Sequence, residues 1–161
     1  MKFLKEIKLF AFDLDGTLYF GEKIVPGAKE LIKYLREKYK IAFFTNNSSQ
    51  TSDRVHEKLN NMRIGCSRDE VYTSSTATAL YLKEKKIDNI YVIGSNRFRD
   101  EIENNGLRII DNSSAENLVV GLDLDFNYNK IKNALSVILR GGKFIACNED
   151  KFFPIGENRY M

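Results

Sequence analysis

The chain has 161 residues, of which 43% are hydrophobic and 29% are charged, the composition of a folded globular protein rather than a disordered one. Lys and Arg exceed Asp and Glu by only three and are spread along the sequence, which argues against a nucleic-acid surface, and no apolar stretch reaches the length of a membrane span. Cys66 and Cys147 lie far apart without a CxxC pattern. We therefore expect a reduced, cytoplasmic protein with no metal site built on cysteine.

Strand and helix signals alternate along the first half of the chain. Pro26 and Gly27 open a segment whose apolar residues recur at helical spacing, and the wholly apolar run 41–44 is typical of a central parallel strand. This order predicts a doubly wound α/β sheet. The predicted elements are a strand at 7–12, a helix over 28–39, a strand at 41–44, a helix between Ser52 and Gly65, a strand at 71–73 and a helix at 76–85.

The alternation continues in the second half, which predicts a second α/β lobe. The polar stretch around 83–88 is the expected boundary, so we assign 1–83 to one domain and 84–161 to the other. The helix at 129–140 should direct Ile131, Ala134, Leu135 and Ile138 inward. The remaining predicted elements are strands at 89–93, 107–110, 118–120 and 143–146 and a helix at 97–105.

The strongest chemical signal is an apolar strand that leads Asp13 and Asp15 into a turn at Gly16. Residues two apart in a strand point to the same side, so the two carboxylates should project together. Two neighbouring acids repel, which implies a bound cation or a shared proton. Gly16 lets the backbone approach a ligand, and its amide can donate to an anion. The alternative is a turn without chemistry, because Asp-Gly is a common turn pair.

A second polar group, Thr45-Asn46-Asn47, follows the predicted strand at 41–44. Ligands of open α/β sheets bind beyond the carboxyl ends of parallel strands, so this group should face the same crevice as the two aspartates. Carboxylates for a nucleophile and a metal would then lie beside donors suited to phosphate oxygens. The arrangement predicts phosphoryl transfer through an aspartyl-phosphate.

Two motifs resemble those of the haloacid dehalogenase (HAD) superfamily. Residues 13–18, Asp-Leu-Asp-Gly-Thr-Leu, are similar to its first motif, and residues 43–48, Phe-Phe-Thr-Asn-Asn-Ser, are similar to its second. The residues of these two motifs resemble those of the branch of small-molecule phosphatases typified by NagD and 4-nitrophenylphosphatase. Further segments resemble the same branch, at 26–28, 72–74, 92–94, 119–123 and 144–148.

The resemblance implies a fold, a cofactor and residue roles. The fold would be a parallel-sheet HAD-like core with an inserted α/β cap domain, here 84–161. Asp13 would attack phosphorus, Asp15 would act as general acid and then base, and Mg2+ would bind the Asp13 carboxylate and the Asp15 backbone carbonyl. Thr45, Asn46 and Asn47 would hold the phosphoryl group, and the substrate would be a small phosphorylated metabolite.

The resemblance also implies a lysine and a further acid in two later motifs, for which relatives would run on by roughly another hundred residues, about one small domain. We therefore expect a chain truncated before these motifs, with an incomplete core and little phosphatase turnover of its own. Lys143 is a tempting substitute, but it opens a predicted cap strand. The repeat Asp123-Leu124-Asp125 lacks the following Gly-Thr and is expected to be a cap loop.

A second hypothesis is a non-catalytic remnant that binds a phosphate ligand or serves in assembly. Relatives often pair through the cap, so a homodimer is expected, with neither nucleic acid nor membrane as a partner. Phe152 and Phe153 are the best aromatic candidates for a substrate platform.

Overall fold

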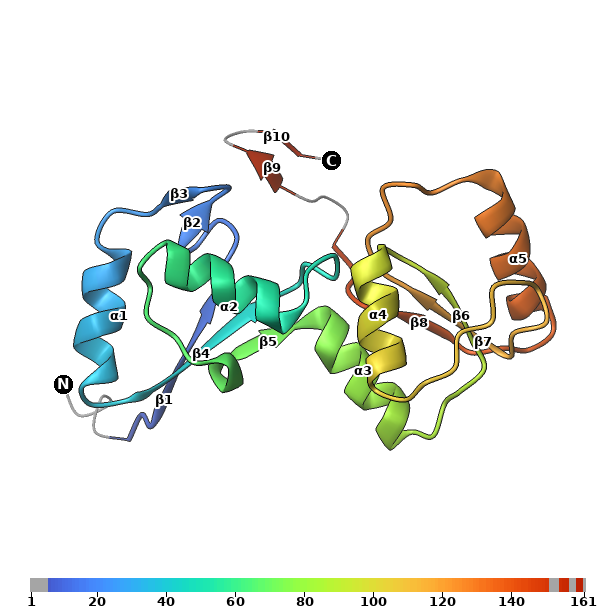
Figure 1. The fold of residues 1–161 in the computed structure, drawn as a ribbon, viewed down its shortest axis with the longest axis horizontal. Coiled ribbons are helices and arrows are strands. Elements are labelled where there is room, and N and C mark those ends of the chain that lie inside the picture. The colour runs from blue at the N-terminus through green and yellow to red at the C-terminus, as the bar shows by residue number, and fades with distance from the viewer. Residues whose placement is uncertain (1–5, 151–153, 157–158, 161) are drawn as a thin grey trace. The chain divides into compact units, whose positions relative to one another are not determined.

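The computed structural model describes residues 6–150, 154–156 and 159–160, which Figure 1 draws as a coloured ribbon. The chain divides into two compact units. The first unit comprises Met1–Thr45, Ser52–Tyr72 and Asp150–Met161, and the second comprises Asn46–Thr51 and Thr73–Glu149. Phe152 and Phe153 lie outside the described residues.

The first unit is built on a sheet with the strand order β1–β4–β5. β1 (Leu9–Asp13) pairs in parallel with β4 (Lys40–Thr45), and β5 (Val71–Thr73) follows β4 in the order. The helices α1 (Ala28–Arg36) and α2 (Ser52–Asn61) share one apolar core with this sheet. That core contains Ala28, Ile32, Leu35, Ile41, Phe43, Val55, Leu59, Ile64 and Val71.

The opposite face of this sheet carries exposed apolar side chains. Side chains alternate along a strand, so Leu9 and Phe44 point away from the core that holds Ile41 and Phe43. Leu9, Phe44 and Tyr72 are each more than two-fifths exposed, and the rings of Phe44 and Tyr72 stack with centroids 5.1 Å apart.

Five short elements complete the described part of the first unit. β2 (Tyr19–Phe20) and β3 (Lys23–Ile24) form an antiparallel hairpin, and the 3-10 helix η2 (Arg68–Glu70) precedes β5. β9 (Pro154–Gly156) and β10 (Arg159–Tyr160) form a second antiparallel pair.

The second unit is a parallel sheet with helices on both faces. The strand order is β6 (Ile90–Ile93), β7 (Asn117–Val120) and β8 (Phe144–Ala146). One face packs against α3 (Ser74–Glu84) and α4 (Asn96–Asn104), and the other packs against α5 (Tyr128–Leu139). All four residues of β6 are buried, as expected for a strand covered on both sides.

The helices of this unit begin at side-chain caps. Thr73 accepts a hydrogen bond from the amide of Thr76 at the start of α3, and Ser95 accepts one from Phe98 at the start of α4. Asn127 accepts from the amides of Asn129 and Lys130 at the start of α5. Each cap satisfies amides that have no partner inside the helix, which fixes where the helix starts.

Two predictions about this unit were wrong. Residues 107–110 do not form a strand, and their only bridge joins Ile109 to Ile90. On α5 the buried residues are Ala134 and Val137, whereas Ile131, Leu135 and Ile138 are each more than two-fifths exposed. The helix is therefore rotated relative to the prediction, and part of its apolar surface faces outward.

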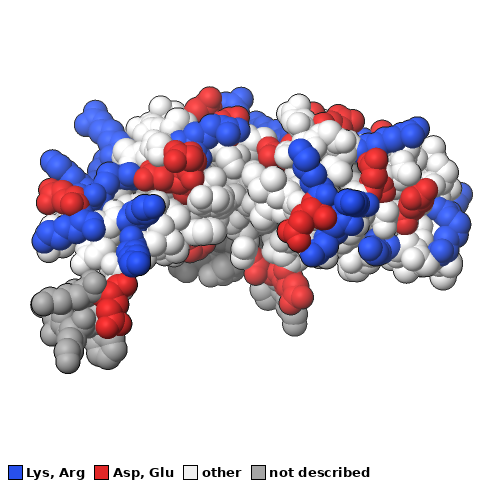
Figure 2. All heavy atoms as spheres, turned by 90° about the horizontal axis from the view of Figure 1, so that it is seen from below, with Lys and Arg blue, Asp and Glu red and all other residues white. Residues whose placement is uncertain are grey.

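The compact units divide the chain at Thr73 rather than near residue 84, because Ala79 and Leu82 of α3 share a core with Phe98 and Ile102 of α4. The assignment of domains to 1–83 and 84–161 stays a prediction. Figure 2 shows Lys and Arg side chains interspersed with Asp and Glu on the face that it draws. Within the described residues, no helix combines the length and apolar character needed to cross a bilayer.

Candidate active site

Asp13 is the last residue of β1, one position beyond the predicted end of that strand. Its side chain is exposed, and the hydroxyl of Thr17 donates a hydrogen bond of 3.0 Å to its Oδ2 atom. Oδ2 is thereby oriented by the turn that follows the strand. Among the described residues, no hydrogen bond engages the other carboxylate oxygen, Oδ1, so it can meet an incoming ligand.

The turn after Asp13 needs glycine for its backbone conformation. Gly16 has a φ of 88°, a region that other residues rarely adopt, and the carbonyl of Leu14 accepts the amides of Thr17 and Leu18 at 3.1 and 2.9 Å. The Gly16 amide donates to the carbonyl of Tyr19 at 2.8 Å. The expectation that this amide serves an anion was therefore wrong, because the turn itself uses it.

Asp15 lies half-buried between polar groups of the first unit. The hydroxyl of Thr45 donates to its Oδ2 at 3.3 Å, and the hydroxyl of Tyr19 also bonds to its side chain. Burial raises the pKa of Asp15, and the charge of Asp13 acts in the same direction. The charge of Lys58 and the two hydroxyl donors lower the pKa but do not cancel the effect of burial. A carboxyl that holds its proton more tightly than usual is suited to act as a general acid.

Two residues at this site were missed by sequence analysis. Tyr19 is 2% exposed, and the Nζ atom of Lys58 on α2 lies 4.0 Å from its ring centroid and 4.0 Å from Oε1 of Glu22. Lys58 places a cation beside Asp15 from a different element. The sequence signal that could have indicated Lys58 was its position in the helix. It directly precedes the buried Leu59, on the side of α2 that packs on the sheet.

The predicted partners Asn46 and Asn47 follow Thr45 in the chain but belong to the second unit. The Oδ1 atom of Asn47 accepts hydrogen bonds from the amide and the hydroxyl of Ser49, at 2.9 and 2.6 Å. The structure therefore brings together Asp13, Asp15 and Thr45 in the first unit. The phosphate-binding role of Asn46 and Asn47 stays a prediction.

The loop 46–51 is fixed by hydrogen bonds within the second unit. The carbonyl of Asn46 accepts from the hydroxyl of Ser74 at 2.8 Å. The hydroxyl of Ser48, which is 1% exposed, accepts from the amide of Leu122 at 2.8 Å. These bonds give a polar loop a defined course without a regular element.

The donor set of the first unit fits a hard divalent cation in type, because carboxylate and carbonyl oxygens are the ligands that Mg2+ prefers. Asp13 and Asp15 lie close enough for the charge of one to raise the pKa of the other. Among the described residues, no group of three or more His, Cys, Asp or Glu side chains is placed to hold a metal ion. Asp13 and Asp15 are therefore the two acids that the described part of the first unit can offer to a metal ion.

The second Asp-Leu-Asp sequence is a self-contained loop. Asp123 is 3% exposed in its side chain, receives Lys130 Nζ at 2.6 Å and accepts the Asp125 amide at 3.0 Å. Lys143 stands directly before β8 and is exposed. Asp123 thus has a local partner and a structural role.

Comparison with known proteins identifies the class. A family model described as haloacid dehalogenase-like hydrolase matches residues 10–108, which include Asp13, Asp15 and Thr45. The chain belongs to this family.

Several individual proteins are similar to the chain over nearly all of its length. The acid sugar phosphatase of Staphylococcus haemolyticus is 35% identical over 153 residues, which are 94% of this chain and 58% of that protein. The crystal structure of 4-nitrophenylphosphatase from Thermotoga maritima is 32% identical with a TM-score of 0.87, over 94% of this chain and 58% of that one. The p-nitrophenyl phosphatase from Archaeoglobus fulgidus is 31% identical with a TM-score of 0.86, over 96% and 59%. The chain therefore spans about three-fifths of the length of these relatives.

Proposed function

We propose that this protein is a Mg2+-dependent phosphatase of small phosphate monoesters that works through an aspartyl-phosphate on Asp13. The observation that carries the proposal is the pairing of two unlike carboxyls at the end of β1. Asp13 is exposed with one oxygen oriented by Thr17, and Asp15 is half-buried with a raised pKa. Relatives named as sugar and nitrophenyl phosphatases support the same reaction class.

In the first step, an oxygen of Asp13 attacks phosphorus and the bond between phosphorus and the ester oxygen breaks. The leaving oxygen takes the proton of Asp15, so the alcohol departs neutral and Asp15 becomes a carboxylate. Lys58 and the hydroxyls of Tyr19 and Thr45 stabilise that carboxylate. Thr45, Asn46 and Asn47 hold the phosphoryl group in this proposal.

In the second step, the Asp15 carboxylate takes a proton from water while the water oxygen attacks phosphorus. The bond between phosphorus and Asp13 breaks, and inorganic phosphate leaves. Asp13 and the backbone carbonyl of Asp15 would hold Mg2+, which supplies positive charge against the phosphate oxygens.

We propose further that the 161-residue chain turns over slowly, because the described part of the chain supplies two acids and no third for a metal site. The competing function is a non-catalytic module that binds a phosphate ligand. The two differ in one respect, which is whether Asp13 becomes covalently phosphorylated.

The test uses the intact chain with p-nitrophenyl phosphate, with Mg2+ or with a chelator. We expect Mg2+-dependent release of nitrophenol and, after acid quenching, the mass of one phosphoryl group on the peptide that contains Asp13. Binding without a phosphorylated peptide and without turnover would favour the non-catalytic module. Fast turnover that survives the chelator would contradict the Mg2+ proposal.

The compartment and the assembly are also proposals. Cys66 and Cys147 are free thiols, and burial raises the pKa of each to about 11, in keeping with a reducing cytoplasm. The exposed apolar side chains of α5, Leu135 and Leu139 among them, support a homodimer formed through the second unit. Light scattering on the purified chain measures whether that dimer forms.

A further inference from the structure

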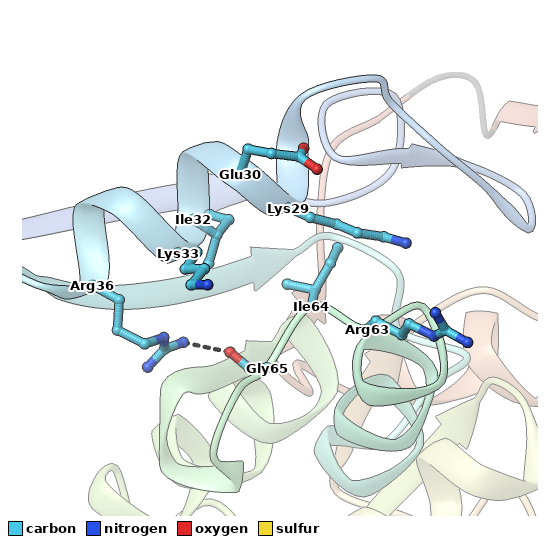
Figure 3. A pocket seen from close by; sticks show the side chains of 8 residues that line it. All are labelled: Lys29, Glu30, Ile32, Lys33, Arg36, Arg63, Ile64 and Gly65. Atoms are coloured by element: carbon cyan, nitrogen blue, oxygen red, sulfur yellow. Dashed lines mark hydrogen bonds between the residues drawn. The ribbon is translucent and has the colours of Figure 1, made fainter.

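The first unit contains a pocket of about 390 Å³ between α1 and the turn that follows α2. Figure 3 shows its lining, which takes five side chains from α1 and three residues from the turn. A volume of this size is in the range of small-molecule sites. None of the predicted active-site residues lines it. Its charged members are Lys29, Glu30, Lys33, Arg36 and Arg63.

The lining carries four cations and one carboxylate. Arg36 is already engaged, because its guanidinium contacts both carboxylate oxygens of Glu70 at 2.5 and 2.9 Å and the carbonyl of Gly65 at 2.7 Å. For Lys29, Lys33 and Arg63, the described residues provide no carboxylate within ion-pair distance. Set against the single lining carboxylate, that of Glu30, these three cations leave the pocket with a net positive charge from its described lining.

The base of the pocket is apolar. Ile32 is 2% exposed and Ile64 is 1% exposed, and Figure 3 shows their side chains between α1 and the turn. In this view the charged ends of Lys29 and Arg63 lie toward one end of the pocket. Ile32 and Ile64 themselves expose almost no surface, so the apolar part of the lining, which exceeds its polar part, comes mainly from the aliphatic portions of the longer side chains. The pocket therefore combines anchoring charges with an apolar surface, as expected for an anion attached to a carbon skeleton.

Arg63 occupies a position where glycine is usual. The amides of Arg63 and Ile64 donate to the carbonyls of Asn60 and Leu59 at 2.8 and 2.9 Å, the two bonds of a Schellman helix end, and Arg63 has a φ of 60°. A residue with a Cβ atom is less stable than glycine in this conformation. The chain therefore has a guanidinium at the pocket in place of the more stable glycine.

We propose that this pocket binds a small organic phosphate, with the phosphate oxygens on Lys29 and Arg63 and the carbon skeleton against the apolar part of the lining, over Ile32 and Ile64. Phosphate fits these donors because the guanidinium can contact two oxygens in one plane while the lysine acts as a point charge. The proposal does not depend on the phosphatase reaction, since no residue of the pocket takes part in it.

The experiment titrates the intact chain, labelled with 13C at the isoleucine δ1 methyl groups, with phenylphosphonate, which a phosphatase cannot hydrolyse. We expect saturable shifts of the Ile32 and Ile64 methyl resonances. Inorganic phosphate should bind more weakly, because it lacks the apolar contact, and neutral benzyl alcohol should leave both resonances unchanged. These two methyl groups report on the pocket separately from any binding at Asp13.

Arg63→Gly is the decisive variant, because it should weaken phenylphosphonate binding about tenfold through loss of a charged hydrogen bond while raising the melting temperature. Lys29→Ala should also weaken binding and serves if Arg63→Gly does not fold. Lys132→Ala, which removes an exposed cation from α5, should bind as the parent does. The proposal would be overturned by methyl shifts that do not saturate, or by equal shifts with benzyl alcohol. It would also be overturned if inorganic phosphate bound as tightly as phenylphosphonate, or if both pocket variants kept the affinity of the parent.

Discussion

The hydroxyl of Thr45 donates a hydrogen bond of 3.3 Å to Oδ2 of Asp15, which lies 30 residues earlier in the chain. This bond joins the end of β4, at Thr45, to the turn that follows its parallel neighbour β1, which ends at Asp13. It orients the carboxyl that serves as the acid in our proposal. It also opposes the rise in pKa that burial imposes on Asp15.

Asp13→Asn should remove the nucleophile and leave the fold intact. An amide retains an acceptor for Thr17 but cannot attack phosphorus, so we expect phosphorylation of the chain to disappear and any turnover to fall by on the order of a thousandfold or more. Mass spectrometry after p-nitrophenyl phosphate treatment measures the first effect, and circular dichroism checks the fold. The matched control is Asp125→Asn in the second Asp-Leu-Asp sequence, which should phosphorylate as the parent does.

The raised pKa of Asp15 predicts a particular dependence of stability on pH. The folded state binds the Asp15 proton more tightly than the unfolded state, whose ordinary pKa is 3.8. This contribution is fully present below pH 3.8 and is lost as pH rises through the folded pKa. Asp15→Asn cannot ionise, so its stability relative to the parent should increase with pH across that window. Urea unfolding at several pH values measures the difference, and a difference that stayed constant or shrank would contradict the assigned shift.

Lys58→Met should raise the pKa of Asp15 further. The variant removes the cation that favours the Asp15 carboxylate and keeps a chain of similar length beside the Tyr19 ring. The carboxyl 13C resonance of Asp15, followed against pH, gives the pKa directly. Lys132→Met changes the net charge equally in the second unit and should leave that titration where it was; a parallel shift in both variants would assign the effect to net charge alone.

Ser48→Ala should destabilise the second unit. The Ser48 hydroxyl is buried and accepts the amide of Leu122, so the alanine variant leaves that donor without this partner, at a cost of about 1–3 kcal/mol. Denaturant unfolding measures the loss. Ser114→Ala, at an exposed position, should change the free energy of unfolding by less than about 0.5 kcal/mol, and equal effects of the two variants would refute the assigned role.

Sequence periodicity predicted the positions of the long elements well, although not the buried face of α5. The strand at 71–73 appears with its predicted bounds. The other predicted strands and helices that are present in the structure begin or end within a few residues of the predicted positions. The β2–β3 hairpin was missed because strands of two residues are too short to show a period. The segment 107–110 has the composition of a strand, yet it pairs with the free edge of β6 only at Ile90, through the bridge to Ile109.

The proximity of Asp13, Asp15 and Thr45 could be predicted from the sequence for a simple reason. Asp13, Asp15 and Thr45 stand at the ends of apolar strands, and parallel strands bring their carboxyl ends together. Lys58 could not be predicted in the same way, because its approach to Asp15 depends on how α2 packs rather than on a motif. The outward face of α5 is a similar case, since periodicity locates an apolar stripe but does not say how much of it is covered.

The two cores of the second unit lie on opposite faces of the same strands, β6 and β7. Ile90 and Val92 of β6 pack in the layer with α3 and α4, while Tyr91 and Ile93 pack in the layer with α5. Neither layer can separate without exposing one side of β6 to water. Backbone amides of this strand should therefore exchange with solvent only when the whole second unit unfolds, more slowly than those at the ends of its helices. The order of amide exchange thus follows from a run of four apolar residues.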